Sequence, residues 1–390
     1  MKKVLLFILI ICSVEFWGFF LVPKPLMYLG YIFSWMIMGY CLLFSYSKKD
    51  IYFKNCVILF LIGIFTNILS AYINHGQSFW MTFLAFKNYT FILLYFYLSK
   101  NEVSEKYVER LIIFFAIVFS IFYLIQMSVY PLEIFETKIY EDRGTLRIRL
   151  LGNGFLGLAI LMQVNQFFIK KRLINLVMAL AFFCVLILGG FRLLPLTILF
   201  CSGLIFFRIN KFSLKSIMKI SAIGIFLIIV LVQIPFIYNI LEEMILRSES
   251  DIDRGQDSIR FIQFSYFFYE FTPNIGAYIL GNGLPNGDST YGQEHMLIQE
   301  QSNLFWMDLG LLGLWIVAGG VIVIAILWYS VKAIFTSVPK EKFYLVMYFL
   351  YLVMVSFTSA EIFRIGLFGV QAIVLYLIDK SRVKSLEINR

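Results

Sequence analysis

The sequence predicts an all-α polytopic membrane protein with about twelve transmembrane helices. Of its 390 residues, 61% are hydrophobic and only 15% are charged, against roughly half and a quarter in soluble domains. The mean hydropathy is +0.84. Apolar runs recur from end to end, and a helix needs about 20 such residues to cross the hydrocarbon core. The runs are continuous, whereas β-barrel strands alternate. These figures exclude a soluble enzyme, a disordered chain and a secreted disulfide scaffold.

Twelve apolar runs are the predicted spans. Lys2 and Lys3 before the first run resemble the start of a signal peptide, but no small-residue cleavage site follows, so we expect an uncleaved span. The eighth run is short and the sixth is rich in glycine. The runs cover residues 4–22, 26–46, 56–74, 79–98, 111–130, 150–169, 173–190, 193–207, 217–238, 305–329, 343–359 and 363–379.

Lysine and arginine fall unevenly between the two sides if the N-terminus is cytoplasmic and the spans alternate. Of the 33 basic residues, 22 then lie in inside segments and ten outside, as the positive-inside rule requires. We therefore expect both termini in the cytoplasm. The inside segments hold 17 lysines and 5 arginines, and the outside segments hold 2 lysines and 8 arginines. Arginine binds phosphate oxygens in pairs, so the outer arginines predict an anion site, unless they pair with nearby acids or lipid phosphates.

Two outside segments are long. The first covers residues 131–149, and the second runs from about 239 to 304 with ten acidic residues against three arginines. Loops of that length in a compact protein are usually functional. The stretch 256–270 is aromatic and looks helical, so we expect it to lie on the membrane surface with Arg260 near the headgroups. The predicted regions are residues 1–238 with nine spans, the outer loop 239–304, and residues 305–390 with three spans and a cytoplasmic tail.

Several familiar patterns do not define a site. Asp251-Ile252-Asp253 matches the DxD of metal-dependent glycosyltransferases, but no nucleotide-binding domain surrounds it. Gly281-Asn282-Gly283 follows no strand and indicates a turn. Only two histidines exist, so a metal site is not expected. The net charge of +9 lies between spans and does not indicate nucleic-acid binding, and the five cysteines are expected to be buried free thiols.

Charged residues within or beside spans are functional candidates by default, because burying a charge in lipid is costly. Glu15 and Lys87 fall in the first and fourth spans, where they either pair or Lys87 extends to the surface. Arg364 lies three residues after Glu361, and we expect a local pair. Arg192 opens the eighth span at the outer surface.

Four features together are typical of one family. The largest outer loop lies between spans 9 and 10. The segment GGFRLLPLTIL places Arg192 after the seventh span, and IRFIQFSYFFYEFTPNIGAYILGNGLPNG contains Arg260, a helix, a proline and a glycine-rich turn. The segment QSNLFWMDLGLLGLW leads into span 10 with two spaced glycines. With these features the chain resembles the bacterial O-antigen polymerase and O-antigen ligase superfamily.

The resemblance implies an enzyme that transfers glycans from undecaprenyl pyrophosphate at the outer leaflet of the bacterial inner membrane. A polymerase joins lipid-linked oligosaccharide repeat units into O-antigen or capsular polysaccharide, whereas a ligase moves the glycan to lipid A-core. A lipid-linked oligosaccharide flippase is the other alternative, although the sequence lacks the internal repeat typical of transporters. Membrane lipids and a protein that regulates chain length are the other expected partners. No cofactor is implied.

The family pattern also implies which side chains contact the pyrophosphate. Arg192 and Arg260 are the principal expected contacts, supported by Arg143, Arg147 and Arg149. Arginines aimed at the leaving pyrophosphate would stabilise its developing charge without a metal ion.

A hydroxyl of the acceptor sugar needs a base within hydrogen-bond reach. Many family members have His-Asn before the glycines of span 10, but this chain has Ser302-Asn303 there. The departure favours the polymerase, because the ligase is expected to carry a histidine in this loop. It leaves His295, Glu294 and Glu300 as the catalytic candidates.

Overall fold

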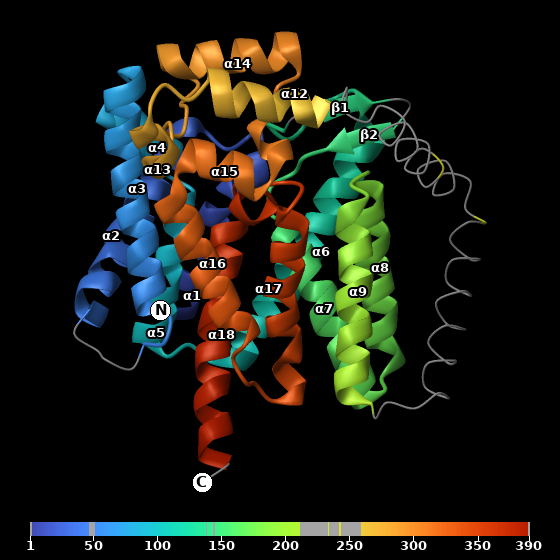
Figure 1. Cartoon of the computed structure of the whole chain (residues 1–390). Helices are drawn as coiled ribbons and strands as arrows, with labels where there is room; N and C mark the ends of the chain where they lie inside the picture. Colours follow the sequence, from blue (N-terminus) through green and yellow to red (C-terminus); the bar gives the residue numbers. More distant parts are fainter. Residues whose placement is uncertain are drawn as a thin grey trace.

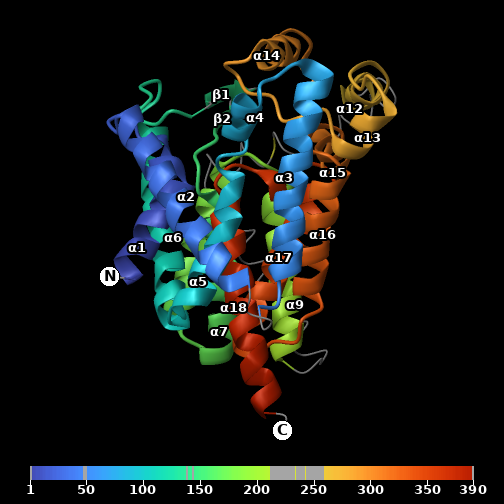
Figure 2. The ribbon, with the colours of Figure 1, turned by 90° about the vertical axis from the view of Figure 1, so that its left-hand side faces the viewer.

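The computed structural model describes residues 2–46, 51–137, 139–142, 145–210, 233, 242 and 259–388. Over these residues the chain forms sixteen α-helices and one two-stranded antiparallel sheet. Most of the long helices run side by side, and α12 and α14 lie across one end of the bundle (Figures 1 and 2). The all-α prediction is therefore confirmed, apart from a short hairpin that the sequence pattern did not indicate.

The elements fall into two groups. The bundle contains α1 (Lys2–Ser13), α2 (Lys24–Tyr46), α3 (Lys54–His75), α4 (Phe79–Ala85), α5 (Leu94–Asn101), α6 (Glu105–Val129), α7 (Asn153–Lys170), α8 (Leu173–Leu188), α9 (Leu193–Ile209), α16 (Gly320–Ile334), α17 (Phe343–Ser356) and α18 (Leu367–Ile388). Near one end lie β1 (Ile139–Asp142), β2 (Thr145–Ile148), α12 (Ile259–Ser265), α13 (Ile275–Leu280), α14 (Thr290–Ser302) and α15 (Leu311–Ala318). We call this the hairpin end, and the opposite end, which holds the C-terminus, the C-terminal end (Figure 1).

Three helices in the described part of the chain are long and apolar enough to cross a membrane: α2, α3 and α6. A fourth span results if α4 and the helical segment Tyr89–Asn101, which are bent by 65° at a short break, count as one. Helices α8, α9 and α16 are apolar but shorter. The number of twelve spans stays a prediction, and the predicted ninth span, 217–238, lies outside the described residues.

The predicted tenth span, 305–329, is broken rather than continuous. A 3-10 turn at Trp306–Leu309 leads into α15, which ends at Gly319, and α16 follows in a different direction (Figure 1). Gly319 has φ +94°, a left-handed conformation that favours glycine. The break prevents the usual helical pairing of the carbonyl groups at the end of α15, and in an apolar environment such groups need other partners.

A glycine-rich turn supplies those partners. The backbone N–H groups of Asn282 and Gly283 donate to the carbonyl oxygens of Ile316 and Val317 over 2.8 and 3.0 Å. Asn67 of α3 also donates from Nδ2 to the Val317 oxygen over 2.9 Å. The turn therefore fits between α3 and the broken helix, and its amide groups complete the hydrogen bonding of both.

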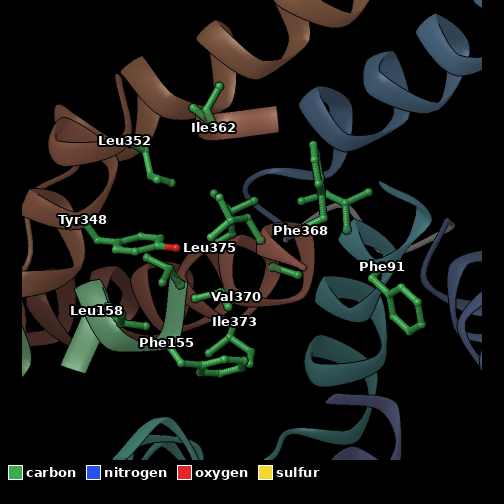
Figure 3. Packing of buried hydrophobic residues seen from close by; sticks show 14 of the residues in the cluster. Phe91, Phe155, Leu158, Tyr348, Leu352, Ile362, Phe368, Val370, Ile373 and Leu375 are labelled. Carbon is green, nitrogen blue, oxygen red and sulfur yellow. The ribbon is translucent and has the colours of Figure 1, made fainter. Parts of the chain in front are cut away.

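The core lies where α7, α17 and α18 meet (Figure 3). Phe155 of α7, Tyr348 of α17 and Ile373 of α18 are at most 1% exposed. The outer surface is also apolar: on α2, Leu29 is 63% exposed and Leu43 is 75% exposed. A water-soluble protein rarely exposes large apolar patches, so this surface fits a helix that faces lipid.

Segments predicted on the same side of the membrane contact one another. At the C-terminal end, Lys332 Nζ donates to the Tyr52 carbonyl over 2.6 Å, and Lys342 Nζ lies 2.6 Å from Glu109 Oε1. At the hairpin end, the Ala360 N–H donates to the Met307 carbonyl over 2.8 Å. This arrangement agrees with alternating spans.

Two expected ion pairs and the state of the cysteines are confirmed. Lys87 Nζ lies 3.3 Å from Glu15 Oε1, and Arg364 Nη1 lies 3.0 Å from Glu361 Oε2. Tyr31 and Asn88 also donate to the Glu15 carboxylate, so this half-buried charge is well satisfied. All five cysteines are free thiols; four are buried and Cys184 is partly exposed.

We predict that Gly281→Ala destabilises the protein by about 1–3 kcal/mol. Gly281 has φ +84°, and a Cβ there would lie 2.7 Å from the Val317 carbonyl oxygen, inside the docked turn. Thermal unfolding in detergent would show the loss as a lower midpoint. The control is Gly203→Ala in α9, where no described atom lies within 4 Å of the new Cβ. If both variants unfold at the wild-type midpoint, the turn does not hold the broken helix.

Candidate functional site

Three arginines surround the ring of Phe191 at the hairpin end. The Cζ atoms of Arg147, Arg149 and Arg364 lie 5.7, 5.8 and 5.3 Å from the ring centroid. These distances are within the range of cation–π attraction. We call these three residues the arginine cluster. Its members come from β2, the residue after β2, and the connection between α17 and α18, so two distant segments build it around a ring from a third.

Glycine makes room for the cluster. Phe191 follows Gly189-Gly190 in the connection between α8 and α9. Gly190 has φ +70°, and a Cβ there would lie 3.3 Å from Cγ of Arg147. A side chain at Gly190 would therefore strain the backbone and press on Arg147. The two glycines before Phe191 thus allow the side chain of Arg147 to pack against the connection between α8 and α9.

Arg364 is held by an acid from its own connection. Its Nη1 lies 3.0 Å from Glu361 Oε2, and Asn153 at the start of α7 donates from Nδ2 to Glu361 Oε1 over 2.8 Å. Glu361 is 6% exposed. Both carboxylate oxygens are hydrogen-bonded, so Glu361 fixes the guanidinium beside Phe191.

A small pocket with a cavity volume of about 30 Å³ adjoins the cluster and opens to solvent. Apolar side chains of α6, α7, α8 and α9 form most of its wall, including Phe119, Leu156 and Leu186. Arg149 and Arg364 are its cationic lining residues. Two guanidinium groups beside an apolar wall match the chemistry of a ligand with an apolar part and an anionic part.

Asp308 relates Arg260, another of the arginines expected from the sequence, to the region of the arginine cluster. It lies in the 3-10 turn Trp306–Leu309 and has exposed surface. Partial removal of its carboxyl group from solvent raises the pKa of Asp308, whereas the positive charges of Arg149 and Arg260 and the polar side chain of Gln263 act in the opposite direction. Arg149 and Arg260, from two different segments, therefore both act on one carboxylate.

Helix α12 orients Arg260 and Gln263 together. The two residues are three apart, so they lie on the same face of the helix. Gln263 is buried, and its Nε2 donates to the Asn303 carbonyl over 3.0 Å. That bond ties α12 to the segment that leads to Asp308. Four residues further along the chain, the ring of Phe267 lies 6.1 Å from that of His295.

His295 lies in an aromatic environment. It is 3% exposed, its Nε2 is 2.9 Å from Gln299 Nε2, and the ring of Phe271 lies 5.6 Å away. Burial, with a smaller contribution from His75, lowers the pKa of His295 to about 4. At neutral pH the ring is therefore uncharged. Glu294 and Glu300 are exposed on the same helix, α14.

The expected site residues are therefore distributed unevenly. Arg147 and Arg149 belong to the arginine cluster, and Arg192 is the half-buried N-cap residue of α9, next to Phe191. Arg143 lies outside the described residues. The contacts of His295 among the described residues are with Gln299 and aromatic rings, Glu294 and Glu300 are exposed on α14, and the catalytic role of all three stays a prediction.

Sequence reasoning missed Asp308. A signal was present, because the aspartate directly precedes the glycines in MDLGLLG at the start of a predicted span. A carboxylate at such a boundary is unusual and merits a functional hypothesis. Comparison with models of protein families, with curated proteins and with solved structures finds no match to this chain. Function is therefore inferred from the site and from the sequence patterns.

We predict that acid weakens the fold through His295. The folded pKa of about 4 lies below the ordinary 6.5, so the unfolded chain binds the proton more readily. Stability is then complete above pH 6.5 and falls by up to about 3 kcal/mol as the pH drops to 4. His295→Phe should reduce this loss, measured as the thermal midpoint in detergent from pH 7 to 4.

The matched control is Glu300→Gln, an exposed position on the same helix, which should keep the wild-type dependence on pH. An unchanged acid loss in His295→Phe would assign the sensitivity to other groups.

Proposed function

We propose that the chain is a membrane enzyme that polymerises oligosaccharide repeat units carried on undecaprenyl pyrophosphate. The product is O-antigen or capsular polysaccharide, made at the outer leaflet of the bacterial inner membrane. One observation carries the proposal: the guanidinium groups of Arg149 and Arg364 line a pocket whose other walls are mostly apolar. A lipid pyrophosphate needs such a pairing of guanidinium groups with apolar walls.

The chemistry follows from this arrangement. Glycosyl transfer breaks the bond between the sugar and the pyrophosphate, so negative charge grows on the leaving oxygen. Guanidinium groups at that position favour the transition state over the ground state, and no metal ion is required. Their hydrogen bonds are stronger where water is scarce, as at the mouth of an apolar pocket. The pocket walls would receive the isoprenoid carbons nearest the phosphate.

The proposed topology has twelve spans and two cytoplasmic termini. Two observations support it: the segments predicted inside contact each other at the C-terminal end, and the N-terminal Lys2 carbonyl accepts a hydrogen bond from Tyr97 near the predicted inner connection. The arginine cluster, Arg260 and Asp308 would then face the outer leaflet, where lipid-linked repeat units are polymerised.

The proposed topology predicts which introduced cysteines react with a reagent that cannot cross the membrane. A cysteine replacing Asp288, which is exposed at the hairpin end, should react with a membrane-impermeant thiol reagent in intact spheroplasts. A cysteine replacing Lys340, which is exposed at the other end, should react only after permeabilisation. The native cysteines give a low background because four of five are buried. Equal labelling of both variants in intact spheroplasts would refute the orientation.

The proposed site predicts that a positive charge without the guanidinium group does not support normal polymer formation. Arg149→Lys, Arg192→Lys and Arg260→Lys should each shorten or abolish the polymer in a complemented null strain, because lysine lacks the planar fork that holds two phosphate oxygens. Protein level in the membrane should not change. A loss of about 10- to 100-fold corresponds to about 1.4–3 kcal/mol of transition-state stabilisation.

The control is Arg208→Lys. Arg208 also lies over an aromatic ring, 5.8 Å from Phe343, but at the C-terminal end. It should support full-length polymer. Normal polymer in all three test variants would remove the pyrophosphate role. The null strain itself separates the alternatives: core lipid capped with one repeat unit indicates a polymerase, core lipid without any repeat indicates a ligase, and single repeats retained on the cytoplasmic side indicate a flippase.

A further inference from the structure

We infer that Asp308 is the general base of this site, which takes the proton from the acceptor sugar hydroxyl. The inference rests on the proposed glycosyl transfer. It replaces the expectation that a residue of α14 performs this step, and it is carried by the geometry of the turn that bears Asp308.

The turn is fixed on both sides. The Asp308 N–H donates to the Phe305 carbonyl over 3.1 Å, and the Ala360 N–H donates to the carbonyl of Met307 over 2.8 Å. Gly310 has φ +60°, and a Cβ there would lie 2.6 Å from the carbonyl oxygen of Phe357 at the end of α17. The chain therefore approaches this helix end as closely as only glycine permits. A side chain on such a fixed turn is pre-positioned, which a base requires.

The charges around Asp308 suit the step. The positive charges of Arg149 and Arg260 favour its ionised form, and the bond from Gln263 Nε2 to the Asn303 carbonyl holds α12 beside the turn. The Met307–Ala360 bond also brings the turn beside the connection that carries Glu361 and Arg364. A pyrophosphate held by the arginines would have its bond to the anomeric carbon next to the carboxylate. The base and the leaving-group site are thus neighbours, as transfer between two bound sugars demands.

Other carboxylates and the buried histidine fit the role less well. Glu361 is buried, and its two oxygens already bind Arg364 and Asn153. His295 is 3% exposed beneath aromatic rings, so an acceptor hydroxyl has no direct access to it. Asp308, by contrast, combines exposed surface with the positive charges of two arginines nearby.

In the proposed glycosyl transfer, the acceptor hydroxyl oxygen attacks the anomeric carbon of the donor sugar, and its proton passes to an oxygen of the Asp308 carboxylate. A new glycosidic C–O bond forms while the C–O bond to the pyrophosphate breaks. The bonding pair stays on the pyrophosphate oxygen, whose charge the arginines stabilise. The proton on Asp308 then leaves to water. Burial raises the pKa of Asp308, which makes the carboxylate a better proton acceptor than an ordinary aspartate.

Asp308→Asn tests the inference because it keeps the shape of the side chain and removes the basic group. We expect polymer formation to fall by about 100-fold or more, in membrane vesicles that contain the native lipid-linked repeat units. We expect binding of undecaprenyl pyrophosphate alone to the purified full chain to be unchanged or tighter, because a negative charge beside the anion is lost. Asp308→Glu should retain part of the activity. Asp288→Asn, an exposed aspartate at the same end, is the matched control and should behave as wild type.

The pH profile separates a base from a positioning residue. Wild-type activity should fall on the acid side as Asp308 becomes protonated, and the residual activity of Asp308→Asn should lack that decline. Two results would overturn the inference: polymer formation by Asp308→Asn within a few-fold of wild type, or loss of undecaprenyl pyrophosphate binding in that variant. Failure of the proposed function looks different, because Arg149→Lys and Arg260→Lys would then bind undecaprenyl pyrophosphate as wild type does.

Discussion

The hydrogen bonding of the broken helix is the constraint on which the hairpin end depends. A single straight helix from residue 306 to residue 334 would be about 43 Å long, well beyond an apolar layer of about 30 Å. The break at Gly319 solves this problem but leaves backbone carbonyls in need of donors. Asn282, Gly283 and Asn67 supply them, and the turn that does so connects α13 to α14. The break also allows Asp308 to lie under α12 instead of at the tip of a long helix.

Basic side chains have different surroundings at the two ends of the bundle. At the C-terminal end, Lys342 lies between Glu105 and Glu109, and Arg382 is 3.8 Å from Asp379. The Lys342 pairs join the start of α17 to α6, the Arg382 pair lies within α18, and both balance charge locally. At the hairpin end, three guanidinium groups gather around one phenylalanine ring, and Glu361 holds that of Arg364. Gathered guanidinium groups raise the local positive potential, which favours an anion there.

The predictable features of the fold are those set by local patterns. Apolar runs located most helices, the pair Glu361 and Arg364 followed from their spacing, and the aromatic stretch at 256–270 matches α12 and the turn after it. The features that were missed depend on contacts between distant segments. The breaks after Phe86 and at Gly319 need partners from elsewhere in the chain, and hydropathy reports only length and polarity. The role of Gly281 could be inferred only as a turn, because its close contact with α15 is separated from it by more than thirty residues.

In the candidate site, too, contacts between distant segments changed what the sequence had predicted. From the sequence, His295 is one of three candidate bases, because an imidazole titrates near neutral pH and lies in the long outer loop. In the fold, Phe267 in the helical turn after α12 covers it, and burial lowers its pKa to about 4. Gln263 and Arg260 lie about one and two helical turns before that phenylalanine. Spacings of four and three residues place all three on one face, whose first part adjoins the segment that leads to Asp308 and whose end covers the histidine. In the proposed reaction, the position of α12 therefore leaves the carboxylate of Asp308, and not the covered histidine, accessible to the charged substrate.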